Sequence, residues 1–296
     1  MTISERLLRT VTSIKFIVSI AIIALLATFI AWQYHNSTNI DRVFWGMVDN
    51  SLQTSAYTRH TQQKSGAQSV DQVFETATSP QHRVFSETIF TQTGADSAKA
   101  ITENIGTTTH GYVRYVSVIT AQGLNFSSIL DKWGVSEPEV KGKTTGQLYN
   151  QAVLGVIPVG NLTTEQRREV TKIMKEKKAY SYELVETKRS LPFGRPTYTL
   201  QVTVSPVGYI SALKAYASYV GLNHLEDVKP EEFADADKLS FIVEVDGLTH
   251  QMVATSQNQG AKTEVISGRN FRKTLPSAPR ETIPVEDLQA QLQSIE

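Results

Sequence analysis

Cysteine is absent from this chain of 296 residues. Its absence excludes disulfide bonds, a thiol nucleophile, thiolate metal ligands and a lipid anchor attached through a cysteine. Any folded part must therefore be held together by its hydrophobic core and its hydrogen bonds. That requires a domain large enough to bury a sizeable share of its own surface.

The chain also lacks an excess of charge, because 29 Lys and Arg residues balance 29 Asp and Glu residues. Proteins that bind nucleic acids usually carry a basic surface, so we expect no nucleic-acid partner. The sequence has no Gly-x-Ser-x-Gly elbow, no P-loop and no dinucleotide fingerprint. We therefore expect a protein that is not an enzyme. The alternative left open is a hydrolase whose carboxylate pair is brought together only by folding.

Metal-ligand patterns are missing as well. A group of acidic residues between Glu226 and Asp237 lacks the alternating ligands and the central glycine of a calcium loop. We expect no metal and no cofactor, and the sequence identifies no individual catalytic, metal-binding or ligand-binding residue. The six histidines are scattered, without a His-x-x-x-His spacing: His35, His60, His82, His110, His224 and His250.

Charged side chains are absent from the run Phe16–Trp32, FIVSIAIIALLATFIAW. A helix satisfies its own backbone hydrogen bonds in lipid, and about 20 apolar residues span the hydrocarbon core. With its flanking residues, the run predicts a transmembrane signal anchor over residues 16–34. A cleaved signal peptide is the alternative, which we disfavour because no Ala-x-Ala site stands at the end of the run.

Cations flank this run on one side only, because Arg6, Arg9 and Lys15 precede it and the next cation is Arg42. The positive-inside rule then places residues 1–15 in the cytoplasm and the rest of the chain outside it, in a single-pass protein of the cell membrane. Exported animal domains usually contain disulfides, so an exported domain without cysteine is more typical of a bacterial cell envelope.

The part expected outside the cytoplasm, residues 37–274, has the pattern of an α+β domain. Apolar residues at three- and four-residue steps predict an amphipathic helix from Ser37 to Gln53. Alternating residues rich in Thr, Val, Tyr and Phe, separated by turn signals, predict an antiparallel meander from Ala56 to about Thr120. In its first strand, Tyr57, Arg59 and Thr61 would share one face.

The second half of this domain mixes helices with strands. Thr163 and Gln166 predict a helix that starts with a capping box, and Pro206 and Gly221 mark the two ends of another helix. The other predicted elements are a loop over Gly134–Thr145, a short helix over Gln147–Val153, strands over Tyr180–Lys188 and Thr197–Ser205, a hairpin of Leu239–Val245 and Leu248–Ala254 around Asp246-Gly247, and a last strand over Thr263–Phe271.

Residues 275–296 form a tail with two parts. Prolines favour an extended linker in its first part. An apolar stripe predicts a short helix after the linker, which either docks on the domain or contacts a partner protein. The stripe consists of Val285, Leu288, Leu292 and Ile295.

Many aromatic residues fall on the predicted strands and on the helix after Pro206. Most of them are expected to fill the core between sheet and helices. Some are expected to line an apolar cavity there, because ligand sites are concave and largely apolar. The residues considered are Phe85, Phe90, Tyr112, Tyr115, Tyr198, Tyr209, Tyr216 and Tyr219.

The order of elements resembles the LolA/LppX-like superfamily of exported lipoprotein carriers. The stretches that carry the resemblance are IDRVFWGMVDNSLQTSAYTRH, YTLQVTVSPVGYISALKAY and SFIVEVDGLTHQMVAT. The resemblance implies one strongly curved antiparallel sheet that wraps helices and can hold an acyl chain. The fold class expected for the whole chain is thus α+β, with an N-terminal transmembrane helix followed by a curved antiparallel sheet packed with helices.

Anchor, pattern and resemblance together lead to one functional expectation. It is a membrane-anchored extracytoplasmic binding module for a lipid or another apolar ligand. The alternative is a structural or assembly protein of the cell envelope that binds another envelope protein, for which the apolar stripe of the tail would be the contact.

Overall fold

The computed structural model describes residues 39–295 with short gaps, together with Ile22, Ala24, Leu25 and Thr28. The predicted cytoplasmic tail over residues 1–15 lies outside the described residues. So does the predicted membrane span over residues 16–34, apart from those four positions. The gaps are 79–80, 137–145, 190–194, 223–224, 226, 258–261 and 272–273.

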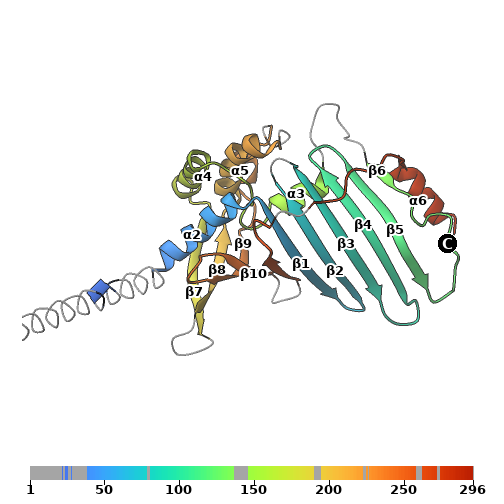
Figure 1. Cartoon of the computed structure of the whole chain (residues 1–296), viewed down its shortest axis with the longest axis horizontal. Helices are drawn as coiled ribbons and strands as arrows, with labels where there is room; N and C mark the ends of the chain where they lie inside the picture. The colour runs from blue at the N-terminus through green and yellow to red at the C-terminus, as the bar shows by residue number, and fades with distance from the viewer. Residues whose placement is uncertain are drawn as a thin grey trace, which may run out of the picture.

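One curved sheet of 12 strands runs through the described part of the chain, in the order β12-β6-β5-β4-β3-β2-β1-β11-β10-β9-β8-β7 (Figure 1). It consists of an N-terminal meander, β1–β6, and a C-terminal meander, β7–β11, joined where β1 pairs with β11. The strands are β1 Ala56–Ser65, β2 Gln68–Ala77, β3 Arg83–Gln92, β4 Ala98–Thr107, β5 Gly111–Thr120, β6 Gly134–Ser136, β7 Tyr180–Arg189, β8 Pro196–Val204, β9 Leu239–Asp246, β10 Met252–Gln257, β11 Lys262–Ser267 and β12 Ile283–Pro284.

The helices gather mainly on the C-terminal meander (Figure 1). There α2, α4 and α5 cover one face of the sheet, which we call the inner face, whereas α3 lies near the middle and α6 at the far end. The helices are α2 Ile40–Gln53, α3 Gln147–Val153, α4 Thr164–Glu176, α5 Pro206–Val220 and α6 Val285–Gln293, with a 3-10 helix, η2, at Pro230–Phe233.

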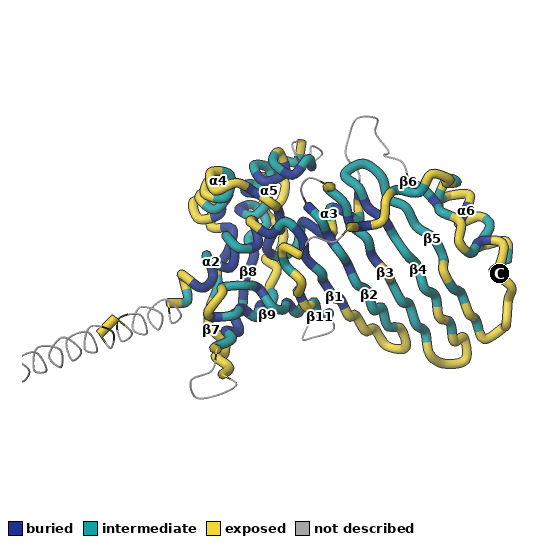
Figure 2. The backbone as a smooth tube through the Cα atoms, viewed as in Figure 1, coloured by how far each residue is buried: buried dark blue, intermediate teal, exposed yellow. Residues whose placement is uncertain are grey.

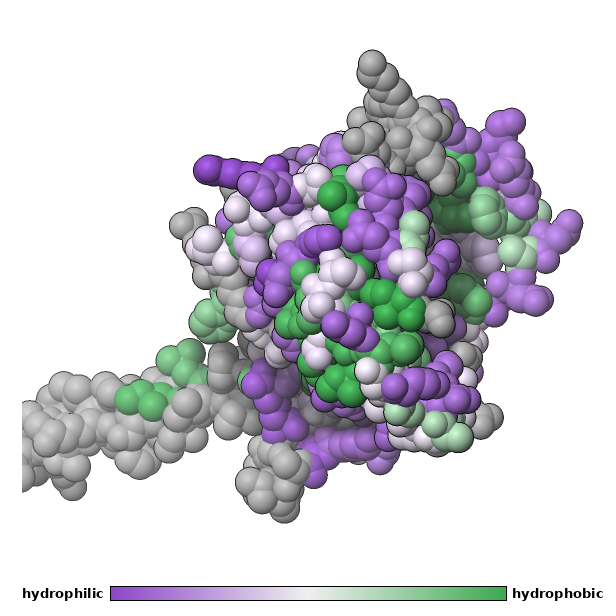
Figure 3. All heavy atoms as spheres, turned by 90° about the vertical axis from the view of Figure 1, so that its right-hand side faces the viewer, coloured by the Kyte–Doolittle hydropathy of each residue, from purple (hydrophilic) through white to green (hydrophobic). Residues whose placement is uncertain are grey.

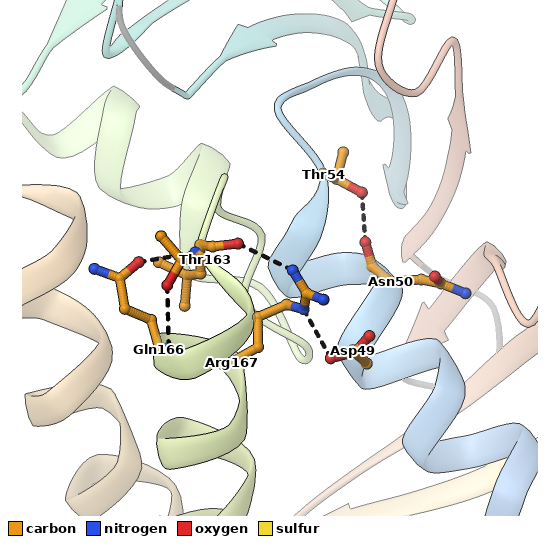
Figure 4. Close-up of polar contacts among 7 residues, drawn as sticks. Asp49, Asn50, Thr54, Thr163, Gln166 and Arg167 are labelled. Carbon is orange, nitrogen blue, oxygen red and sulfur yellow. Dashed lines mark hydrogen bonds and ion pairs between the residues drawn. The ribbon is translucent and has the colours of Figure 1, made fainter.

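The predicted ends of two helices are confirmed. In α5, Pro206 occupies the first turn and Gly221 ends the helix with a φ of 75°, a left-handed conformation that glycine adopts without strain. At the start of α4, the Thr163 hydroxyl accepts from the Gln166 backbone N–H and the Gln166 side chain accepts from the Thr163 N–H (Figure 4). Next to this capping box, Arg167 forms an ion pair with Asp49 at 2.8 Å, which joins α4 to α2.

The main core lies between the inner face of the C-terminal meander and the helices on it. Because strand side chains alternate, one set of strand residues faces these helices. It includes Leu200, Val202, Val243 and Val245, all fully buried together with Phe44 of α2 and Tyr216 of α5.

A second, smaller cluster occupies the opposite end of the sheet. Phe126, Ile129 and Leu288 are buried there, and Val113, Tyr115, Val118, Ile283, Leu292 and Ile295 pack against them. Figure 3 faces this end of the molecule and shows apolar side chains grouped among polar ones.

The predicted fold class, an N-terminal transmembrane helix followed by an antiparallel sheet, is wrong. The sheet is mixed, because β12 pairs in parallel with β6. Within the described residues, no helix is both long enough and apolar enough to cross a membrane. The parallel pair arises because the chain crosses the N-terminal meander after β11, where Pro276 accepts from Arg83, and then runs beside β6 (Figure 1). Pro284 is tolerated there because β12 is an edge strand.

Two further predictions about the strands need correction. The hairpin at Asp246 exists, but its second strand starts at Met252, because the Asp246 carboxylate accepts from the backbone N–H and the hydroxyl of Thr249 and winds the chain into a longer turn. Gly134–Ser136, predicted as part of a loop, forms β6, whose ladder bonds come from β5. The rest of that predicted loop lies outside the described residues.

The predicted tail helix forms as α6 and docks on its own chain. Leu288 is 1% exposed and packs with Phe126 and Ile129. The other three residues of the stripe, Val285, Leu292 and Ile295, are partly buried. Of the two outcomes expected for this helix, docking on the domain is the one that the structure shows.

Candidate ligand cavity

A cavity of about 930 Å³ lies where the two meanders meet. Its floor is the inner face of the sheet, from β2 across β1 and β11 to β8. Its roof consists of the first turn of α5, the region of η2 and the chain that follows α3. The volume is at the upper end of the range of about 300–1,000 Å³ typical of small-molecule sites.

One side of the cavity is apolar. Pro206 starts α5 directly after β8, so the first turn of the helix brings Tyr209 and Ile210 to the cavity wall. Phe233 of η2 and Phe241 of β9 complete this side, which lines the cavity with rings and branched carbon side chains. The other apolar lining residues are Val70, Phe74, Leu154, Val156, Val204 and Leu239.

The other side of the cavity is polar and belongs mainly to the strands at the seam. On β1, Arg59, Thr61 and Gln63 line it at two-residue steps, as expected for one face of a strand. Thr61 stands opposite Gln72 of β2 and opposite Glu264 of β11. The cavity is therefore amphipathic, with an apolar side towards α5 and η2 and a polar floor on β1 and its neighbours.

Tyrosine hydroxyls fix the end of α3 and the chain segment after it, which form part of the roof. They donate to its backbone carbonyls: Tyr57 to Ala152, Tyr209 to Gly155, Tyr180 to Val156 and Tyr216 to Val159. Burial raises the pKa of all these phenols, so they stay protonated and keep donating. The cavity wall is thus held in place from β1, β7 and α5.

Arg59 is the buried charge of the cavity, with 6% of its surface exposed. Its Nη2 donates to the Gln151 carbonyl at 2.9 Å, and its guanidinium carbon lies 4.4 Å from the centre of the Phe74 ring. Its Nε has no hydrogen-bond partner among the described residues. No ion pair within the described part of the chain includes Arg59.

The remaining charged groups of the lining are occupied or solvated. Lys262 and Glu264 pair with each other at 3.1 Å, and the other carboxylate oxygen of Glu264 accepts from the Thr255 hydroxyl at 3.2 Å. Asp237 is exposed to solvent at the rim. Among the charged residues of the described lining, Arg59 is therefore the buried one without a carboxylate partner.

The aromatic residues expected near a cavity divide into four groups. Tyr209 alone of that set lines it, whereas Tyr198 and Tyr216 are buried in the core and Tyr219 bonds to Glu169 at the surface. Phe85, Phe90, Tyr112 and Tyr115 lie on β3 and β5, away from the lining. Alternation along β1 predicts that Arg59 and Thr61 share one face, but it does not show that this face is the inner one. The signal was present in the alternation Tyr57-Arg59-Thr61.

The histidines and the acidic group do not assemble into a metal site. Among the described residues, no group of three or more His, Asp or Glu side chains is placed to hold a metal ion. His60 pairs with Asp71 at 2.6 Å, His82 bonds to Tyr149, and His250 packs against Gly46 of α2. His35, His224 and Glu226 lie outside the described residues.

Comparison with known proteins gives a resemblance in architecture. No protein-family model and no curated protein matches the chain. Among solved structures, it is similar to the crystal structure of LprF from Mycobacterium bovis, with 9% sequence identity and a TM-score of 0.39, over 80% of this chain and 95% of LprF. At this identity and TM-score, the match says nothing about what this chain binds.

Proposed function

We propose that this chain is a binding protein for a lipid or another elongated apolar molecule, which it holds in the cavity between the sheet and the helices. The observation that supports the proposal is the cavity of about 930 Å³ with Tyr209, Ile210, Phe233 and Phe241 on one side. A concave site of this size, with an apolar side and a few polar groups, is typical of sites that bind small molecules.

The proposed activity is binding without a chemical step. The described lining contains no Ser, His or Cys side chain. Its Lys262 and Glu264 side chains bond to each other. These features support a holding role, in which the ligand leaves unchanged.

The proposal includes a location outside the cytoplasm, which the cysteine-free composition supports. A single thiol can be introduced without competition from native cysteines. We expect an Ile119→Cys variant, at a position 62% exposed, to react with a membrane-impermeant maleimide in intact expressing cells. Labelling only after cell lysis would contradict the location and would leave the binding proposal unchanged.

The experiment for the binding proposal combines extraction with a cavity-filling variant. Organic extraction of the purified protein, followed by mass spectrometry, should release a bound lipid. In Ile210→Trp the larger ring would occupy the cavity, so we expect the extracted lipid to fall by about tenfold or more. Ile119→Trp is the matched control, because the same ring is added on an exposed strand position.

Two results would contradict this proposal. The first is a protein that carries no lipid and shows no saturable binding of fluorescent fatty acids. The second is an equal amount of extracted lipid from wild type, Ile210→Trp and Ile119→Trp, which would place the lipid outside the cavity.

A further inference from the structure

We infer that the ligand is an amphiphile whose acidic group, a carboxylate or a phosphate, pairs with Arg59. This inference rests on the proposed function, because it assigns a headgroup to the molecule that the cavity holds. It depends on three observations: a buried guanidinium without a carboxylate partner, a buried hydroxyl without a partner beside it, and the division of the cavity into polar and apolar sides.

The first observation concerns Arg59. A buried cation costs free energy unless a negative partner and further hydrogen bonds compensate for the lost water. Here the compensation consists of one bond to the Gln151 carbonyl and the contact with the Phe74 ring, and the Nε of Arg59 is left without a partner. The planar fork of a guanidinium fits the two oxygens of a carboxylate or phosphate.

The second observation concerns Thr61, two residues along the same face of β1. It is 7% exposed, and its hydroxyl has no hydrogen-bond partner among the described residues. Most buried polar side-chain atoms have a hydrogen-bond partner, so the Thr61 hydroxyl is open to a partner supplied by a ligand. Both groups line the same cavity, and both can donate to an oxyanion.

The protein's own carboxylates do not take this place. Glu264 stands opposite Thr61 across the β1–β11 pair, but its two oxygens bond to Lys262 and Thr255. Asp237 lies at the solvent-exposed rim. A ligand oxyanion is therefore the group that would neutralise Arg59.

The third observation selects an amphiphile over a free anion. The side formed by Tyr209, Ile210, Phe233 and Phe241 offers no partner for a second charged group. A molecule with one acidic end and an alkyl chain would place its acid on β1 and its chain against α5 and η2. Fatty acids and single-chain phospholipids share this chemistry.

Calorimetry on the full chain tests the inference with four probes: dodecanoate, dodecyl phosphate, dodecan-1-ol and inorganic phosphate. We expect the better acidic amphiphile to bind at least about tenfold more tightly than dodecan-1-ol, because hydrogen bonds to charged groups are the stronger ones. Inorganic phosphate alone should give no heat. The acid that binds more tightly identifies a carboxylate or a phosphate as the natural headgroup.

In Arg59→Gln, the dissociation constants of the acidic amphiphile and of dodecan-1-ol should differ by no more than about threefold, while dodecan-1-ol still binds. Arg83→Gln is the matched control. Arg83 also has an unpaired Nε and one bond to a backbone carbonyl, that of Pro276, but it does not line the cavity. This variant should keep the preference for the acid.

The outcomes separate the inference about the acidic headgroup from the proposal that the cavity binds an apolar molecule. Equal binding of acid and alcohol by wild type, or a preference that persists in Arg59→Gln, would overturn the inference and leave the proposed function standing. Binding of no amphiphile at all would overturn both. If Arg59→Gln does not fold, Thr61→Val serves in its place. It removes an unpaired hydroxyl, so the free protein should remain folded while its affinity for the acid falls and that for the alcohol does not.

Discussion

The two meanders belong to one hydrogen-bonded sheet but differ in how their inner faces are covered. In the C-terminal meander, Leu200, Val202 and Val243 are fully buried under helices. In the N-terminal meander, Thr88 and Thr102 occupy facing positions on β3 and β4 and are only partly buried. Figure 2 shows the contrast as a dark, buried half and a half that is mostly intermediate or exposed.

The difference shows where stability and binding are located. Apolar strand residues are stabilised when helices bury them, whereas Thr and Gln side chains can stay exposed to water. The cavity lies at the seam, where the helix cover ends and the polar floor begins. Since the seam strands β1 and β11 belong to different meanders, the site exists only in the complete sheet.

The largest effect on stability is expected from one of two matched substitutions, the first in the helix-covered C-terminal meander and the second in the N-terminal meander. Leu200→Ala, in the covered half, should lower the free energy of unfolding by about 2–5 kcal/mol, because it removes buried carbon and leaves a void. Phe90→Ala on β3 should cost roughly 1 kcal/mol or less, since its ring is only partly buried. Urea unfolding of both variants measures this difference, and equal losses would remove the distinction between the halves.

The second effect tests whether the far end is an independent cluster. Leu288→Ala should cost about 2 kcal/mol, at the lower end for a buried leucine, because its cluster is small. Hydrogen exchange should rise in α6, β6 and β12 and stay unchanged in α5. Faster exchange across α5 as well would show that the two ends unfold as one unit.

The third effect compares two tyrosines of α5 that receive the same substitution. Tyr216→Phe should cost about 1–3 kcal/mol, because it leaves the buried Val159 carbonyl without its donor. Tyr219→Phe removes a surface bond to Glu169 and should change stability by about 0.5 kcal/mol or less. Thermal unfolding of the two variants compares them. A loss in Tyr219→Phe as large as that in Tyr216→Phe would mean that burial does not decide the cost.

Much of the covered half could be predicted from local signals. Pro206 and Gly221 delimit α5, and Thr163 with Gln166 starts α4, because these residues act on their own backbone neighbourhood. The meander of β1–β5 followed from alternation and turn residues. Local signals could not show that β12 pairs in parallel with β6, because that pairing depends on a chain crossing between distant segments.

The cavity was harder to predict than the strands around it. Alternation places Arg59 with Tyr57 and Thr61, but a strand pattern alone does not tell which face becomes the inner one, and a shift of one residue exchanges the faces. The roof depends on Tyr209 and Phe233, which reach the same space from separate parts of the chain. Only the tertiary structure brings them together.

The smallest effect concerns pH and two histidines, one at the turn before β3 and one packed on α2. Burial lowers the pKa of His82, and burial together with the charge of Arg42 lowers that of His250. Below neutral pH the unfolded chain then binds more protons than the folded one. The stability that comes from the neutral histidines is therefore present above their pKa in the unfolded chain, about 6.5, and is lost as the pH falls.

The free energy of unfolding should therefore be lower at about pH 5.5 than at about pH 7.5, since histidine is the side chain that normally titrates in this range. In His250→Gln the difference between the two pH values should shrink. A difference that is unchanged in this variant and in His82→Gln would assign the effect to other groups.

We propose that an apolar chain occupies the seam between the two halves of the sheet. A crystal structure with ω-bromododecanoic acid tests it most directly, because bromine scatters anomalously and marks the end of the chain. We expect a bromine peak inside the cavity, among Tyr209, Phe233 and Phe241. A cavity filled by the protein's own side chains, with bromine found only on the outer surface, would contradict it.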